Sequence, residues 1–454
     1  MTSESDPRIT ANELAEGESP CAVAAAEVQY LCPGETRPIS QAVHFARLAA
    51  FFPKCRLCVH RRETGSLPRQ IVERIDRTLH RVPRETLLTR EGVRGAHLNE
   101  FGPREVGQFA AAFAYELWKR QPRRCSLNES GPPDPARRLG PVVVLGRDSR
   151  VSSPSLVVEA AAALRSAGCR VIDVGIVSGP CIAFAVDHLE AAGGLHVTGS
   201  GGGPSFNGLD FWEANAVPWS QPGQLGCVDA RSVPRPTRQG GDQQSFQAEV
   251  PYSASLLKHF HALRPLRIAV GCGSAFVRDQ FSRIFSQLPG HAEFVSVPTS
   301  DDVERSRALT LDRTVSIVRD GGLHCGAVID EDAQTCRFLD ECGRIIPAPA
   351  LTGQFTRLAR EETESPKVVV DESLASEFTD WRSAEAPPEI CRETTREAMA
   401  RCMVATAADL GVESGDRYWF RGDYPICDAI ITTARLLQAL SRSDRPCSEL
   451  FVDN

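Results

Sequence analysis

The sequence predicts an α/β protein of about three domains, in which helices cover largely parallel sheets. Short apolar runs bounded by glycine alternate with segments of helical spacing along most of the chain. The length of 454 residues fits about three domains of roughly 150 residues each. Hydrophobic residues make up 42% and charged residues 24%, which indicates a globular, water-soluble chain.

The first 85 residues are interpreted as an irregular N-terminal extension with one predicted helix, over residues 40–52. Cys55 and Cys58 form a CxxC pair, which is one half of a structural zinc site. The candidates that complete it are Cys32 with Cys21, His44 or His60. Reduced cysteines packed as small apolar side chains are the alternative. A further hypothesis is that a zinc-stabilised extension recruits a partner protein.

The regular part of the chain begins after this extension. The elements predicted in it are, in order, a helix over residues 106–119, a strand over 142–145, a helix over 155–168 and a strand over 171–174. The last three form a βαβ unit. The same order of strand and helix recurs at residues 268–288 and begins again at residues 368–370, which favours parallel sheets covered by helices.

Charge and hydropathy argue against several classes of protein. The 51 basic and 58 acidic residues give a net charge of −7, which offers no basic footprint for nucleic acid. No apolar run reaches the roughly 18 residues of a membrane helix, and the chain starts polar and acidic. We therefore expect no membrane partner and a cytoplasmic location, where the 16 scattered cysteines stay reduced.

Five short glycine-containing motifs are candidates for a functional site, and the first two lie at residues 91–95 and 146–150. Residues 91–95 read EGVRG and residues 146–150 read GRDSR. Residues 193–210 then read GGLHVTGSGGGPSFNGLD. A hydroxyl at the end of an apolar strand, inside a glycine run whose amides can turn toward an anion, suits Ser200 to hold a phosphate. A glycine-rich turn without a ligand is the alternative.

Two further motifs follow. Residues 326–335 read GAVIDEDAQT, and oxygen donors at alternate positions of such an extended loop point the same way, as Mg²⁺ ligands require. An acidic hairpin without a metal is the alternative. Residues 411–416 read GVESGD, in which a carboxylate and a hydroxyl beside glycines suit the hydroxyl groups of a sugar. An ordinary polar turn is the alternative.

In this order the motifs resemble those of the α-D-phosphohexomutase family, the phosphoglucomutases and phosphomannomutases, over roughly residues 86–440. The resemblance implies three consecutive α/β/α layered domains, over residues 86–250, 251–350 and 351–454. It also implies an isomerase, an intramolecular phosphotransferase that interconverts hexose 1-phosphate and 6-phosphate. The expected route runs through a phosphoserine and a bisphosphate intermediate.

The resemblance also assigns roles to single residues. Ser200 falls on the serine that carries the phosphoryl group, and Arg94 on the arginine that approaches its phosphate. The expected Mg²⁺ ligands are Ser200, Asp330, Asp332 and Gln334. The expected ligands of the hexose phosphate are Glu413, Ser414 and Arg337, the last in place of the arginine that Thr335 replaces in the family motif.

Several positions depart from the family pattern. They are Gly201 and Gly202 for His and Asn, Asp210 for Lys, Gln334 for Asp, Thr335 for Arg, Val412 for Glu and Asp416 for His. Most of these changes remove positive charge or weaken a metal site. Few residues follow residue 440, so we expect the family's fourth domain, which clamps the distal phosphate, to be absent. The competing hypothesis is a catalytically degenerate paralogue that binds a sugar phosphate or a protein partner without turnover.

Overall fold

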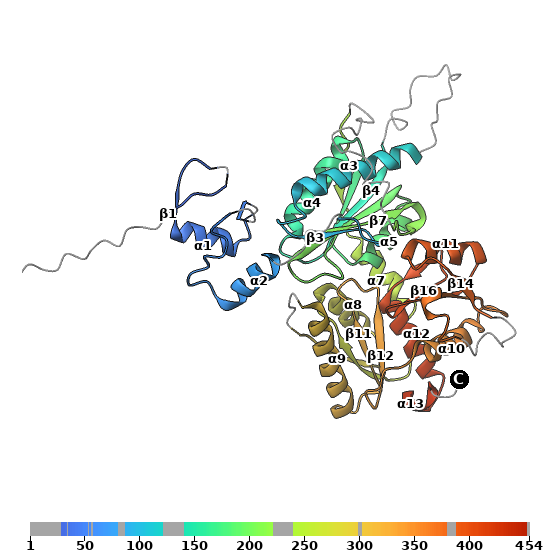
Figure 1. Ribbon diagram of the computed structural model, residues 1–454. Coiled ribbons are helices and arrows are strands. Elements are labelled where there is room, and N and C mark those ends of the chain that lie inside the picture. Colours follow the sequence, from blue (N-terminus) through green and yellow to red (C-terminus); the bar gives the residue numbers. More distant parts are fainter. Residues whose placement is uncertain are drawn as a thin grey trace, which may run out of the picture. The chain divides into compact units, whose positions relative to one another are not determined.

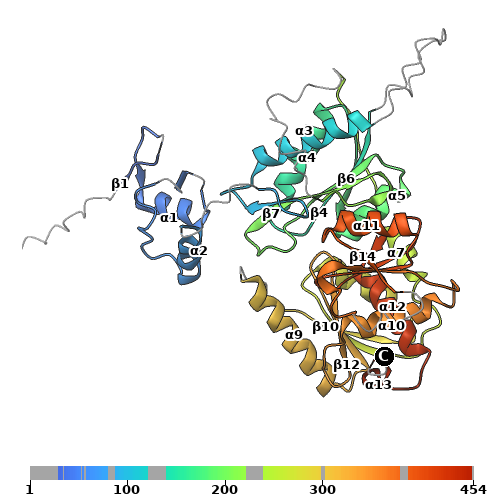
Figure 2. The ribbon, with the colours of Figure 1, turned by 45° about the vertical axis from the view of Figure 1, so that its right-hand side comes forward.

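The computed structural model describes residues 29–33, 35–52, 54–55, 58–79, 87–120, 140–220, 239–297, 302–378 and 387–451 (Figures 1 and 2). The chain forms two compact units, Met1–Pro83 and Arg84–Asn454. The first unit contains an antiparallel pair, β1 (Gln29–Tyr30) and β2 (Ile39–Ser40), followed by α1 (Gln41–Ala49) and α2 (Arg69–Leu79). Its small core gathers around Leu48, Cys55 and Ile75. The helix predicted over residues 40–52 is therefore confirmed as α1.

The second unit begins with a six-stranded sheet of order β3-β7-β6-β4-β5-β8. Its strands are β3 (Val93–Ala96), β4 (Val142–Arg147), β5 (Arg170–Ile176), β6 (Gly193–Val197), β7 (Phe206–Glu213) and β8 (Gln243–Ser245). The four strands β6, β4, β5 and β8 are parallel, whereas β7 and β3 run antiparallel to their neighbours. This mixed sheet extends the predicted βαβ unit at both edges.

Helices cover both faces of this first sheet. They are α3 (Pro103–Arg120) and α4 (Ser153–Ser166) on one face and α5 (Gly179–His188) on the other. The two faces alternate along β4, because Val143 and Leu145 belong to the core under α3 and α4, while Val144 belongs to the core that contains α5. A strand that is buried on both faces reads as a continuous apolar run, which is how the sequence predicted it.

Two smaller sheets follow in the same unit. The second has the order β10-β9-β11-β12, and the third has the order β14-β13-β15-β16-β17. The strands of the second are β9 (Arg267–Gly271), β10 (His291–Val295), β11 (Cys325–Ile329) and β12 (Cys336–Asp340). Those of the third are β13 (Val368–Asp371), β14 (Glu389–Cys391), β15 (Leu410–Glu413), β16 (Arg417–Phe420) and β17 (Ile426–Cys427).

Each of these sheets is also a middle layer between helices. The second lies between α8 (Ala275–Phe285) and α9 (Val303–Asp320), and the third between α11 (Arg396–Thr406) and the pair α10 (Ala348–Ala359) and α12 (Ala429–Ser441). A short helix, α13 (Cys447–Leu450), follows. One apolar core runs from α5 through the second sheet to α12, so the three layered sheets are packed as one unit. The predicted fold class, consecutive α/β/α layers, is confirmed.

Three of the loops that carry motifs each follow the carboxyl end of a strand. The serine loop follows β6, the acidic loop joins β11 to β12, and the GVESGD motif of residues 411–416 joins β15 to β16. The chain turns sharply in the first and third of these loops, where Gly201 and Gly415 have φ of 79° and 83°. These are left-handed conformations that favour glycine. Ligands of open α/β sheets bind at such carboxyl ends of strands.

Candidate active site

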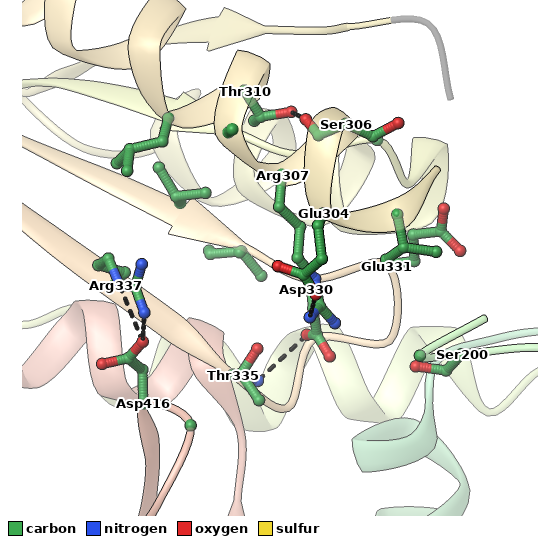
Figure 3. Close-up of a pocket in the computed structure, with 18 of the residues that line it drawn as sticks. Ser200, Glu304, Ser306, Arg307, Thr310, Asp330, Glu331, Thr335, Arg337 and Asp416 are labelled. Carbon is green, nitrogen blue, oxygen red and sulfur yellow. Dashed lines mark hydrogen bonds and ion pairs between the residues drawn. The ribbon is translucent and has the colours of Figure 1, made fainter. Parts of the chain in front are cut away.

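Three of the predicted motifs converge on one cleft of about 570 Å³ (Figure 3). Its walls are the serine loop from Ser200 to Pro204, the acidic loop around Asp330, and the hairpin from Ser414 to Arg417. A fourth wall comes from α9, which adds Arg307. Figure 3 shows Ser200 on one side of this cleft, with Asp330 and Arg307 across from it. A cavity of this size accommodates a small sugar phosphate.

Ser200 stands at the end of β6 and lines the cleft. Its backbone N–H donates to the Thr198 hydroxyl at 3.1 Å, and its carbonyl oxygen accepts from Arg94 Nε at 3.0 Å. The left-handed Gly201 follows directly. Arg94 therefore fixes the main chain of the serine loop, and the hydroxyl of Ser200 stays directed to the cleft.

The GRDSR motif supports the same loop from the other side. Arg150 donates to the carbonyl oxygens of Gly202 and Gly203 at 3.1 and 2.5 Å, and Asp148 accepts from the Gly199 N–H at 2.9 Å. Arg150 also forms an ion pair of 2.6 Å with Glu331 of the acidic loop. No role was predicted for Arg150 or Asp148 from the sequence. The signal that could have indicated one is the presence of two charged residues in a motif that precedes the predicted serine loop.

Asp210 lies beneath the serine loop and is 1% exposed. Its carboxylate contacts Arg94 Nη1 at 2.6 Å as an ion pair, without the geometry of a hydrogen bond. Burial alone would raise the pKa of Asp210, but the charges of Arg94 and Arg396 outweigh it and hold the pKa below its ordinary value. Asp210 is thus a buried carboxylate that neutralises part of the charge of Arg94.

The acidic loop presents only one of its three expected donors to the cleft. Asp330 lines the cleft, and its Oδ1 accepts from the N–H groups of Gln334 and Thr335 at 2.8 and 3.1 Å. Asp332 is 2% exposed and accepts from the Gly179 N–H at 2.8 Å, at the start of α5. The Gln334 amide donates to Asp332. Asp332 and Gln334 therefore lie behind the cleft wall.

The negative charge of the two aspartates in the acidic loop favours the binding of a cation. Burial and the neighbouring Asp332 carboxylate raise the pKa of Asp330 to about 6. Within the described part of the chain, Asp330 forms no ion pair, and Asp332 has only the His196 ring nitrogen, at 3.7 Å. Two close carboxylates with little compensation are a donor set that suits Mg²⁺. The described residues contain no group of three His, Cys, Asp or Glu side chains that could hold a metal, so a third donor must be of another type.

Arg396 is the residue that sequence reasoning missed. It is the first residue of α11 and is 3% exposed. Its guanidinium donates to Glu91 Oε2 at 2.6 Å, to the Glu91 carbonyl at 2.7 Å and to Gln334 Oε1 at 2.8 Å, and it lies 3.7 Å from Asp210. Burial works against the charged form, but Glu91 and Asp210 raise the pKa of Arg396 above its ordinary value. No glycine or acidic motif marks this arginine in the sequence.

The GVESGD motif divides its side chains between the cleft and the interior. Ser414 lines the cleft and donates to Asp371 Oδ2 at 3.0 Å. Arg337 also lines it, in an ion pair of 2.6 Å with Asp416. Glu413 is 4% exposed and accepts from Arg417 and from the Trp419 indole N–H, at 2.9 and 3.0 Å. The structure thus brings Ser200, Asp330, Ser414 and Arg337 together and turns Glu413 inward.

The predicted zinc ligands lie in the first unit. Cys32, Cys55 and Cys58 are buried, and Cys32 Sγ accepts from Arg47 Nη1 at 3.1 Å. They belong to no ligand group of the kind that holds a metal ion among the residues that the structure describes. Cys21 lies outside the described residues. Zinc binding remains a prediction without structural support.

Among the residues that the structure describes, no helix is long and apolar enough to cross a bilayer.

Consecutive α/β/α layers around a cleft lined by a serine, a carboxylate loop and arginines define a layered α/β protein with a polar cleft formed by its loops. Comparison with known proteins agrees. Residues 135–225 match the family model of phosphoglucomutase/phosphomannomutase, alpha/beta/alpha domain I. A protein named phosphohexose mutases from Xanthomonas campestris is 27% identical over 365 residues, which cover 74% of this chain and 78% of that protein.

Other relatives carry related names. A phosphomannomutase of Escherichia coli K12 is 25% identical over 68% of this chain and 72% of its own length. A crystal structure of a phosphoglucomutase/phosphomannomutase family protein from Burkholderia thailandensis has a TM-score of 0.65 at 22% identity, covering 80% of this chain and 78% of that one. The chain is therefore similar to phosphohexomutases over about three quarters of its length. The relatives are named as sugar-phosphate mutases, which are isomerases.

Proposed function

We propose that the protein interconverts hexose 1-phosphate and hexose 6-phosphate, with Ser200 as the carrier of the phosphoryl group. One observation carries the proposal: the serine loop, the acidic loop and the GVESGD motif, which are far apart in the sequence, line the same cleft. That arrangement places Ser200 across from Asp330, with Ser414 and Arg337 on the remaining walls. Such positioning is the main requirement of phosphoryl transfer.

The proposed reaction has two half-reactions. In the first, the bond between phosphorus and Oγ of phosphorylated Ser200 breaks, and a bond to the free hydroxyl of the hexose phosphate forms. The proton of that hydroxyl ends on Ser200 Oγ, and a hexose bisphosphate results. In the second, the bisphosphate turns in the cleft, the bond between its other phosphorus and the hexose oxygen breaks, and a bond from that phosphorus to Ser200 Oγ forms. The proton of Ser200 Oγ passes to the hexose oxygen. Arg94 and Arg150 keep the serine loop in place throughout, through their bonds to its carbonyl oxygens.

Mg²⁺ is the proposed metal ion. Asp330 would hold it in the cleft together with the phosphoserine. Asp332 would have to turn toward the ion from behind the cleft wall, and Gln334 is the third donor expected from the sequence. Bound there, the ion would neutralise charge on the transferring group. The uncompensated charge of the two carboxylates supports this assignment.

For the substrate, we propose a hexose phosphate held by Ser414 and Arg337. Both line the cleft, and a guanidinium suits a phosphate. The buried Glu413 supports the hairpin through Arg417 in this proposal and does not touch the sugar. The names of the relatives include glucose, mannose and glucosamine phosphates, so all three are substrates to test.

A mutase assay tests the proposal. Purified protein is given glucose 1-phosphate, mannose 1-phosphate or glucosamine 1-phosphate with Mg²⁺ and a trace of the bisphosphate, and the 6-phosphate is measured. We expect turnover that Ser200→Ala abolishes. Ser205→Ala changes a serine of the same loop that does not line the cleft and should keep the activity. Full activity in Ser200→Ala would refute the proposed carrier.

Binding without turnover is the second candidate function. It is favoured by one observation: the two arginines that hold the serine loop already carry partners, Arg94 with Asp210 and Arg150 with Glu331. An incoming phosphate would compete with these carboxylates. Calorimetric titration with glucose 6-phosphate distinguishes the two functions, because saturable binding in a protein that turns over none of the three sugar phosphates supports the second.

A further inference from the structure

We propose that Arg396 is a fixed cation of the active site, which holds the third donor of the acidic loop and competes with a divalent metal ion for it. The inference rests on the proposed function in one respect, which is that the acidic loop is the metal site. Arg396 acts here as a positioning residue, because it is not among the residues that line the cleft. Its contacts instead join three segments that are distant in the sequence.

The position of Arg396 is set by its own helix. Thr395 caps α11 by accepting from the Ala398 N–H at 3.2 Å, so the arginine side chain begins at a defined point. The fork of its guanidinium then reaches Glu91 of the EGVRG motif with two nitrogens and Gln334 of the acidic loop with the third. A planar group with five N–H donors can make such contacts at once, which a lysine cannot.

The charges around Arg396 explain two departures from the family pattern together. Where the family has a lysine, this chain has the buried Asp210, and Arg396 lies 3.7 Å from its carboxylate. Where the family has a third aspartate, this chain has Gln334, whose neutral amide oxygen accepts from Arg396. A positive charge lost at position 210 is thus replaced from α11. The positive charge of Arg396 is already neutralised by the carboxylate of Glu91. A carboxylate at position 334 is therefore not needed to neutralise it.

The same contact has a consequence for metal binding. A cation that used Gln334 Oε1 would have to approach the atom that Arg396 already holds at 2.8 Å, next to a buried positive charge. Like charges at that distance repel strongly in a dry site. The acidic loop therefore binds a divalent ion through Asp330 and Asp332 without Gln334, and binds it weakly while Arg396 is in place.

The test measures the affinity of the full-length chain for Mn²⁺, without any sugar phosphate, by calorimetry and by the electron-spin signal of free Mn²⁺. Gln334→Leu removes the amide oxygen and leaves Arg396 with Glu91. We expect its affinity to stay within about twofold of the unchanged chain, whereas loss of a true ligand or its support costs roughly 10- to 100-fold. A tenfold loss in Gln334→Leu would overturn the inference.

Arg396→Met removes the guanidinium and should tighten Mn²⁺ binding about tenfold. Because this change strands Glu91, the double variant Arg396→Met with Glu91→Gln is the second form to measure. Arg401→Met, on the exposed side of the same helix, is the matched control and should leave the affinity unchanged. If the unchanged chain binds no Mn²⁺, a folded Arg396 variant must gain binding. Unchanged or weaker binding in both folded variants refutes the inference, whatever Ser200 does in the mutase assay.

Discussion

Arg94 donates from Nε to the main-chain carbonyl oxygen of Ser200 at 3.0 Å, and its Nη1 contacts the buried carboxylate of Asp210 at 2.6 Å. The arginine of the EGVRG motif therefore holds the serine loop by its backbone, while its charge is shared with the carboxylate of Asp210. A phosphate on Ser200 would lie beside a guanidinium that is already placed and needs no rearrangement. The pair Arg94 and Asp210 is thus both a support of the loop and a limit on its positive charge.

The first prediction concerns this pair. Arg94→Met leaves the carboxylate of Asp210 buried with Arg396 as its remaining cation, at 3.7 Å. Because breaking a buried pair leaves an uncompensated charge, we expect the free energy of unfolding to fall by about 3–5 kcal/mol. Urea unfolding measures it. The double variant Arg94→Met with Asp210→Asn should lose less, and Arg283→Met, which breaks an exposed pair with Glu249, should lose under about 1 kcal/mol. A double variant less stable than the single one would contradict the prediction.

The second prediction concerns the ion pair between Arg337 and Asp416 on the cleft wall. Asp416→Asn removes the negative charge and keeps a residue that tolerates the φ of 63° at this position. Arg337 then becomes free for a phosphate, so glucose 6-phosphate should bind several-fold more tightly. Stability should change by less than about 1 kcal/mol, because the pair is exposed. Calorimetric titration is the measurement, and weaker binding in Asp416→Asn would show that Arg337 needs Asp416 to be placed.

A third prediction concerns pH and lies away from the cleft. Asp428 is 1% exposed, accepts from the Tyr252 hydroxyl at 2.7 Å and caps α12 through the Ile430 N–H. Burial raises its pKa from 3.8 to about 6. The stability it contributes is therefore complete below pH 3.8 and is lost as the pH rises through 6. The neighbouring Cys181 and Tyr424 stay neutral over this range, because burial raises the pKa of both.

Asp428→Asn keeps the cap and removes the charge. At pH 7.5 we expect the variant to be more stable than the unchanged chain, by up to about 3 kcal/mol for a rise of this size. The advantage should vanish near pH 4, where both forms are neutral at this position. Urea unfolding at the two pH values gives the difference. An advantage of equal size at both values would show that the charge of Asp428 is not its source.

Much of the fold follows from local pattern. The apolar runs at residues 142–145, 171–174, 268–270 and 368–370 lie inside β4, β5, β9 and β13, because strands buried on both faces need apolar side chains throughout. The strand β7 was not predicted, because Asn207, Gly208 and Asp210 interrupt any apolar run. It forms because β3 and β6 pair with it from both sides, which local sequence does not reveal.

In the site, too, some features follow from local sequence and others depend on tertiary packing. Short motifs indicated which loops meet, and three of them do meet in the cleft. The direction of each side chain did not follow from them. Glu413 turns inward because β15 pairs with β16 in a register that sets it opposite Arg417. Arg396 belongs to no motif, and only the packing of α11 against the first sheet's loops gives it a role.

Phosphorylation of Ser200 is the central claim, and the intact mass of the full-length chain tests it most directly. The protein is incubated with glucose 1,6-bisphosphate and Mg²⁺, and its mass is compared before and after, beside Ser200→Ala and the loop control Ser205→Ala. We predict the gain of one phosphoryl group in the unchanged chain and in Ser205→Ala, and none in Ser200→Ala. No gain in the unchanged chain, or a gain that persists in Ser200→Ala, would contradict the account.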